Sequence, residues 1–314
     1  MRWRVRAACV AAALTAAAGC VQMTIDESGV FVPVAFDAAM AAESGEPIMG
    51  GAAFASEAAW KAAWKERTAS GRLTGEAPAF VATRQEHGRL KTPEGEIAWT
   101  LLSRAGEARP LIVRCGGNAS TRQQSGFAYG VTALPHGDVF LFDYPGSGET
   151  GGEATPARFA GMGDSLTAFV TEKAAGRKLV LWGHSLGGFV CSDLGRRLPQ
   201  SDAVILEASA RNANEVAKAW TPWFAGPFVK INVAESLAGY DNALALKDFR
   251  GPVLVLGAGR DKTLPVRLSR DVADALKAQG ANVTYVEFPG GGHSNFGAQP
   301  EFAGVIAAFF EKLR

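Results

Sequence analysis

Short apolar runs recur through the last two hundred residues of the chain. They span residues 110–115, 138–144, 178–183, 202–208, 251–257 and 282–288. Stretches that favour helices, such as 155–176 and 264–280, separate several of these runs. Strands that are apolar on both faces and alternate with helices are typical of a parallel sheet covered on both sides. The pattern therefore predicts an α/β fold.

Two further segments differ from this rhythm. Residues 79–90 and 95–104 alternate between apolar and polar positions around the turn sequence TPEG, which predicts an antiparallel pair of strands. Residues 209–249 interrupt the strand–helix alternation and predict an insertion or small lid. We therefore expect one domain over residues 79–314, with no second domain inside it.

The N-terminus has the pattern of an export signal. The basic start MRWRVR is followed by a 12-residue apolar run, which is too short to span a bilayer and fits a secretory signal peptide over residues 1–19. The sequence AAGC resembles the lipobox of bacterial lipoproteins, although Ala17 stands where that family usually has leucine. The resemblance implies that Cys20 is acylated and becomes the mature N-terminus. Ordinary secretion with an incidental cysteine is the alternative.

This resemblance also implies a location. The absence of aspartate at Val21 and Gln22 favours the outer membrane, on the periplasmic side, with the protein held by its lipid anchor. Residues 20–78 would then be a spacer and helical extension. A helix is predicted over residues 55–70, where Trp60 and Trp64 are one turn apart. It would cover apolar surface of the main domain or dock near its pocket.

Charge and cysteine content narrow the classes of function. The chain has 32 Lys and Arg against 31 Asp and Glu, so there is no electrostatic argument for a nucleic-acid partner. Of four cysteines, Cys9 would leave with the signal peptide and Cys20 would carry lipid. Cys115 and Cys191 lie in apolar segments, either as a disulfide formed in an oxidising compartment or as two buried thiols.

The sequence GHSLGG, residues 183–188, carries the strongest chemical signal. It has the form G-x-S-x-G and lies between an apolar strand and a helix. Glycines at 183 and 187 leave room for a sharp turn that exposes the Ser185 hydroxyl, and the free N–H groups of the next helix can stabilise an oxyanion. We interpret Ser185 as a nucleophile.

A nucleophilic serine needs a base, which is usually histidine. The chain has four, and only His293 follows Ser185, as the order serine, acid, histidine requires. His184 adjoins the serine but cannot turn back onto it. For the acid that orients the imidazole, Asp261 at a strand end is the first choice and Glu207, at the end of another strand, is the rival. Without that role, Glu207 would be a buried structural partner.

The same reasoning predicts an oxyanion hole. One donor would be the backbone N–H of Leu186, the residue after the nucleophile. A second would come from the backbone N–H of Asn118, in the loop CGGNAS after an early strand. Phe189 and Trp223 are candidate substrate contacts, together with Trp220 and Phe224, because an apolar wall suits an acyl or aryl group. Packing of the lid is the alternative role for these side chains.

Residues 79–314 resemble the α/β-hydrolase family. The elbow GHSLGG, the acid segment GPVLVLGAGRDKTLP, the histidine loop GGGHSNF and the turn DYPGSGET carry the resemblance. CGGNAS is similar to the H-G-N-A oxyanion loop of a branch containing esterases and protein depalmitoylases, with Gly116 in place of the histidine. Asp143 belongs to a structural turn, and Thr150 stands where the family usually has serine.

The resemblance implies a serine hydrolase that works through an acyl-enzyme and needs no metal or organic cofactor. A carboxylic ester is the first expected substrate, a thioester the second and an amide, as in a peptidase-type enzyme, the third. A tethered binding protein that keeps the fold without turnover is the alternative class. The complete set Ser185, Asp261 and His293 argues against that alternative.

Overall fold

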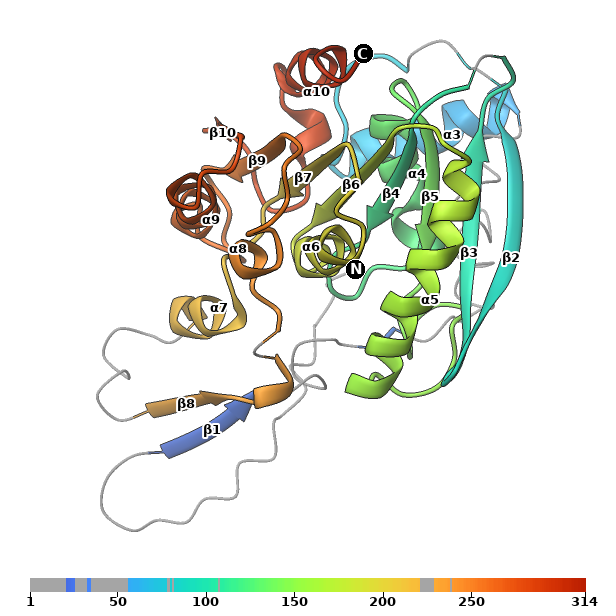
Figure 1. Ribbon diagram of the computed structural model, residues 1–314. Helices are drawn as coiled ribbons and strands as arrows, with labels where there is room; N and C mark the ends of the chain where they lie inside the picture. Colours follow the sequence, from blue (N-terminus) through green and yellow to red (C-terminus); the bar gives the residue numbers. More distant parts are fainter. Residues whose placement is uncertain are drawn as a thin grey trace.

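A central eight-stranded sheet organises the molecule (Figure 1). The computed structural model describes residues 21–25, 33–34, 56–77, 80, 82–106, 108–220, 229–237 and 239–314. The order of the strands across the sheet is β10-β9-β7-β6-β4-β5-β3-β2. The strands are β2 (Arg84–Thr92), β3 (Gly95–Ser103), β4 (Leu111–Cys115), β5 (Asp138–Phe142), β6 (Leu179–His184), β7 (Ala203–Glu207), β9 (Val253–Ala258) and β10 (Val283–Phe288).

All six strands predicted from continuous apolar runs are present, and each pairs in parallel with its neighbours among them. Five of the six, β4 to β7 and β9, are buried at every position, which is why they show no polar alternation. The predicted antiparallel pair is also present. It consists of β2 and β3, and β3 joins the sheet by pairing antiparallel with β5.

Helices cover both faces of the sheet. One layer contains α5 (Pro156–Ala174), α6 (Gly187–Arg197), α8 (Asn242–Ala245) and α9 (Arg267–Ala278). The opposite layer contains α3 (Glu57–Ala69), α4 (Arg122–Ala133) and α10 (Phe302–Glu311). Two separate apolar clusters result, one on each side of the sheet. The α/β-hydrolase fold expected from the sequence is therefore the fold observed.

The sequence pattern did not predict α4. This helix contains Gly126 and Gly130, and glycine has a low helix propensity. Packing compensates, because Phe127 is almost fully buried against the sheet and α3. The side chain of Thr121 also caps the first turn by accepting a hydrogen bond from the backbone N–H of Gln124. Tertiary contacts therefore outweigh local propensity here.

Helix α3 packs on the main domain. Trp60 is only 5% exposed and contacts Phe127 at a ring-centroid distance of 5.4 Å, and Arg67 donates a hydrogen bond to the backbone oxygen of Gln124. Of the two roles considered for this helix, the contacts correspond to covering apolar surface. No helix in the described ranges is long and apolar enough to cross a bilayer.

The segment between β7 and β9 contains α7 (Ala213–Trp220), β8 (Val229–Val233), a short 3-10 helix (Glu235–Leu237) and α8. Strand β8 pairs in parallel with β1 (Val21–Ile25), which begins one residue after Cys20. These two strands form a separate sheet that projects from the body of the molecule (Figure 1). The sequence pattern predicted neither strand. Each is short, and its partner is more than two hundred residues away in the chain.

Candidate active site

Ser185 lies on a sharp turn between the end of β6 and the start of α6. Its φ angle is +54°, a left-handed conformation that a residue with a side chain rarely adopts. A Cβ atom on Gly187 would lie 2.1 Å from the backbone oxygen of Cys115, and one on Gly183 would lie 2.3 Å from the oxygen of Gly187. Both glycines are therefore required for the strand and helix to approach so closely.

Three side chains predicted as catalytic are brought into one hydrogen-bonded series. The Oγ atom of Ser185 lies 2.9 Å from Nε2 of His293, and Nδ1 of His293 lies 2.7 Å from Oδ2 of Asp261. The other oxygen of Asp261 accepts hydrogen bonds from the backbone N–H groups of Thr263 and Leu264. The Asp261 side chain is only 1% exposed, whereas the His293 side chain is 18% exposed. The carboxylate is therefore fixed, and the imidazole can reach a substrate.

Glu207, the rival acid, faces the opposite layer of helices. Its Oε2 atom accepts a hydrogen bond from the indole of Trp182 at 2.9 Å and lies 3.8 Å from Nη2 of Arg114. The Arg114 guanidinium, itself almost fully buried, lies between the rings of Trp182 and Tyr129, 4.2 and 4.4 Å from their centroids. Glu207 is therefore a buried structural partner, which is the second role considered for it.

His184 does not contact the Ser185 hydroxyl. Its Nε2 atom lies 2.7 Å from the backbone oxygen of His293, and its Nδ1 atom lies 3.4 Å from the hydroxyl of Tyr129. Burial lowers the pKa of His184 below its ordinary value, so the ring is neutral at pH 7. The His184 ring therefore connects Tyr129 to the backbone of the loop that carries His293.

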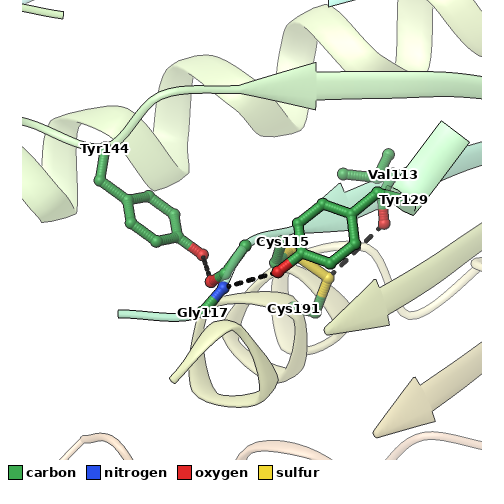
Figure 2. Close-up of a disulfide and its surroundings, with 7 residues drawn as sticks. Val113, Cys115, Gly117, Tyr129, Tyr144 and Cys191 are labelled. Atoms are coloured by element: carbon green, nitrogen blue, oxygen red, sulfur yellow. Dashed lines mark hydrogen bonds between the residues drawn. A yellow bond between two sulfur atoms is a disulfide. The ribbon is translucent and has the colours of Figure 1, made fainter. Parts of the chain in front are cut away.

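The loop after β4 lies against the serine turn, as a second oxyanion donor requires. Tyr144 donates a hydrogen bond to the backbone oxygen of Gly116 at 2.6 Å, and the N–H of Gly117 donates to the hydroxyl of Tyr129 at 3.2 Å (Figure 2). Burial raises the pKa of Tyr144 well above its ordinary value, so its hydroxyl remains a donor. Asn118 follows directly on the surface, and its side-chain oxygen accepts from the N–H of Ala119.

The predicted first donor is at the start of α6. Leu186 is the N-cap residue of this helix, and no acceptor for its backbone N–H is found in the part of the chain that the structure describes. The N-terminus of an α-helix carries partial positive charge and favours an anion. The position therefore suits a developing oxyanion next to Ser185.

A disulfide joins Cys115, the last residue of β4, to Cys191 on α6 (Figure 2). The two Cα atoms are 5.8 Å apart, and both residues are fully buried. Of the two alternatives left open by the sequence, the structure contains the disulfide. It ties the strand before the oxyanion loop to the helix after Ser185, and sequence alone could not show that these cysteines meet.

The turn that begins at Asp143 has a structural role, as its resemblance to the family implied. The Asp143 carboxylate is fully buried and pairs with the guanidinium of Arg122 at 3.0 Å, while also accepting from the backbone N–H of Arg122 and of Glu149. Thr150, at the position of the usual serine, accepts a hydrogen bond from the N–H of Ala98 at 2.8 Å. A threonine hydroxyl therefore supplies the contact that this position needs.

The substrate-contact residues are less completely described. Phe189 is 5% exposed and packs at the start of α6 against Tyr240, with ring centroids 6.3 Å apart. Trp223 and Phe224, and the side chain of Trp220, lie outside the described residues. Within the ranges that are described, no group of three or more His, Cys, Asp or Glu side chains could hold a metal ion.

Sequence reasoning missed the residues that support the site, chiefly Tyr129, Tyr144 and Arg114. Tyr129 lies on the helix that was not predicted, and Tyr144 lies in a turn noted only for its aspartate. An arginine within an apolar strand was the one available signal, since a buried charge requires partners. Nothing in the linear sequence identified those partners.

Comparison with known proteins shows which families the chain resembles. Lysophosphatidylserine lipase ABHD12 of Danio rerio is 30% identical over 205 residues, 58% of this chain and 51% of that protein. The chain spans about half the length of the first curated relatives it matches.

Among solved structures, the acylaminoacyl peptidase of Pyrococcus horikoshii superposes with a TM-score of 0.57 at 16% identity, covering 73% of this chain and 41% of that one. The esterase PF2001 of Pyrococcus furiosus gives 0.57 at 15% identity, covering 77% and 96%. These likenesses show the same fold. Residues 115–304, well over half of the chain, also match the sequence profile described as the Alpha/beta hydrolase family. By its sequence, its sheet and its serine turn, the chain belongs to the alpha/beta hydrolase family.

Proposed function

We propose that the protein is a serine hydrolase that cleaves a carboxylic ester, or a thioester, through an acyl-enzyme intermediate. One observation carries this proposal, namely the hydrogen-bonded series from Ser185 through His293 to Asp261. A buried carboxylate, an oriented imidazole and a hydroxyl on a strained turn are the components that nucleophilic acyl transfer needs.

The chemistry follows from these positions. Nε2 of His293 takes the hydroxyl proton as Ser185 Oγ attacks the acyl carbon, and the same nitrogen then delivers that proton to the leaving oxygen or sulfur. Asp261 holds the proton on Nδ1 and stabilises the imidazolium that forms. Water, activated by His293, then hydrolyses the acyl-enzyme and restores the serine.

The oxyanion of each tetrahedral intermediate would be stabilised by the backbone N–H groups of Leu186 and Asn118. Such donors contribute mainly in the transition state, and loss of one typically costs about 3 kcal/mol. The position of Leu186 at the N-terminus of α6 supports its role. The contact of the 116–117 peptide with the serine turn supports the role of the loop that contains Asn118.

The preference for esters rests on two kinds of support. The relative from Danio rerio is named as a lipase, and esterases are among the proteins with this fold. Apolar candidates for the acyl site, Phe189 and Trp223, suit a hydrocarbon group, and Phe189 lies at the start of the helix that follows Ser185. Peptidases share the fold too, so an amide remains the third candidate.

A panel of substrates tests this function. We expect hydrolysis of p-nitrophenyl esters, with a maximum at one acyl length, faster than the matching acyl thioesters and much faster than p-nitroanilides. A fluorophosphonate probe should label the folded protein at Ser185 and stop turnover in proportion to labelling. Folded protein that hydrolyses none of these compounds and takes up no probe would instead be the tethered binding protein.

We also propose that the mature protein is anchored by acyl groups on Cys20 at the periplasmic side of a bacterial membrane, preferably the outer membrane. The pairing of β1 with β8 supports a folded rather than a trailing N-terminus, because β1 begins at the residue after Cys20. Intact-mass measurement of protein extracted from membranes should show a diacylated or triacylated Cys20 as the first residue. A mature N-terminus at any other residue would contradict the anchor.

A further inference from the structure

Four groups form a continuous chain of polar contacts beneath the candidate active site. The N–H of Gly117 lies 3.2 Å from the hydroxyl of Tyr129, which lies 3.4 Å from Nδ1 of His184. Nε2 of His184 lies 2.7 Å from the backbone oxygen of His293. This series of polar contacts begins at Gly117, in the loop that precedes Asn118, and ends at His293, in the loop that supplies the candidate base.

The donor in each contact can be assigned. The carbonyl oxygen of His293 can only accept, so Nε2 of His184 carries a proton. The buried ring is neutral at pH 7, since burial lowers its pKa, and Nδ1 is therefore an acceptor. The hydroxyl of Tyr129 donates to Nδ1, and its oxygen accepts from Gly117. Every contact has one donor and one acceptor, in a single direction from Gly117 to His293.

Packing fixes the members of this chain. A Cβ atom on Gly117 would lie 2.8 Å from Nδ1 of His184 and 3.5 Å from Cβ of Ser185, so the loop rests directly on the serine turn. The Tyr129 ring is held from its face by the Arg114 guanidinium, which Trp182 covers on the other side. The Tyr129 hydroxyl therefore has little freedom to move away from the loop.

We propose that Tyr129 and His184 are positioning residues that couple the oxyanion loop to the loop carrying His293. This inference rests on the proposed serine hydrolase function. Tyr129 orients the peptide that leads into Asn118, because its hydroxyl accepts from the N–H of Gly117. His184 fixes the position of the His293 backbone, and that position determines where the His293 imidazole lies relative to Ser185. The His184 and His293 rings lie 5.0 Å apart between centroids, but no hydrogen bond joins Tyr129 or His184 to the Ser185 hydroxyl or the His293 imidazole in the described part of the chain. The effect of Tyr129 and His184 is to hold the oxyanion donors and the His293 imidazole in the correct positions relative to Ser185.

Such a role predicts a defect in kcat more than in KM. A misplacement of about 1 Å in catalytic geometry can lower the rate about a hundredfold, while an acyl chain would still bind in its pocket. We expect Tyr129→Phe to lower kcat about tenfold with KM within about twofold, because the 3.4 Å contact is at the long end of hydrogen bonding. His184→Leu, which removes the 2.7 Å contact, should lower kcat by about a hundredfold.

A conservative variant separates positioning from simple stability. Glutamine at position 184 keeps an N–H donor near the place of Nε2 but has no acceptor near the place of Nδ1. His184→Gln should therefore recover much of the activity lost in His184→Leu. In Tyr129→Phe/His184→Gln the combined loss of kcat should be smaller than the product of the two single losses, because both changes interrupt one chain.

The matched control is Tyr285→Phe, which removes a hydroxyl that bonds to Glu287 on the last strand. It should leave kcat unchanged. Each variant is compared at equal folded concentration, judged by circular dichroism and thermal unfolding. If His184→Leu does not fold, Tyr129→Phe and His184→Gln still decide the matter. If the unmodified protein is active and both Tyr129→Phe and His184→Gln keep its kcat, the positioning role is overturned. It is also overturned if the loss of kcat in the double variant equals the product of the two single losses. An inactive parent would overturn the proposed function instead.

Discussion

Replacement of Ser185 by alanine is expected to lower kcat for the best p-nitrophenyl ester by about a millionfold, with the fold retained. The hydroxyl oxygen of Ser185 lies 2.9 Å from the base, and no other serine or threonine hydroxyl in the described ranges hydrogen-bonds to the His293 imidazole. Residual rate over water would come from the oxyanion donors and substrate binding. Steady-state kinetics measures the loss of kcat, and fluorophosphonate labelling measures the loss of the reactive hydroxyl.

The matched control for this variant is Ser192→Ala. Ser192 lies on α6, the helix that follows Ser185. It is fully buried, and its hydroxyl has no hydrogen-bond partner in the described part of the chain. Removing an unpaired buried hydroxyl is nearly neutral or slightly stabilising, so activity and labelling should persist. Substantial esterase activity remaining in pure Ser185→Ala would show that a different nucleophile is responsible.

Reduction of the Cys115–Cys191 disulfide is expected to lower the free energy of unfolding by about 4 kcal/mol. The bond closes a loop between residues 76 positions apart, and a cross-link of that span removes much of the entropy of the unfolded chain. Denaturant titration of the oxidised and reduced protein measures the difference as a lower midpoint. Because the thiols stay in place after reduction, this comparison isolates the cross-link from side-chain packing.

The variant Cys115→Ala/Cys191→Ala supplies the second comparison. It should unfold at a still lower denaturant concentration than the reduced protein, since two fully buried sulfur atoms are also lost from the core. Identical midpoints with and without reductant would mean that the bond contributes nothing to stability. A disulfide of this kind is typical of exported proteins, which supports the proposed location outside the cytoplasm.

The parallel strands could be predicted because burial on both faces leaves a local trace, a short continuous apolar run. Helix α4 left no such trace, since its glycines oppose a helix and only packing by Phe127 and neighbouring residues stabilises it. The pairing of β1 with β8 could not be predicted from the sequence either, because each strand is short and its partner is remote in the chain.

For the candidate site, the sequence by itself determined Ser185 and His293. The serine turn is a local motif with its own glycines and flanking elements, and chain order left one histidine. The same local information favoured Asp261 but could not exclude Glu207, because both end apolar strands. Only the tertiary structure decided between them, by directing Glu207 to Trp182 and Arg114 and bringing Asp261 to His293.

The tertiary structure alone also decided that Cys115 meets Cys191 and that Tyr129 and His184 connect two loops of the site. These contacts join residues 55 to 109 positions apart. A short-range pattern records the backbone geometry of a turn, a strand or a helix. Contacts between distant side chains depend on how the sheet and its two helical layers pack, and no local pattern in the sequence records that.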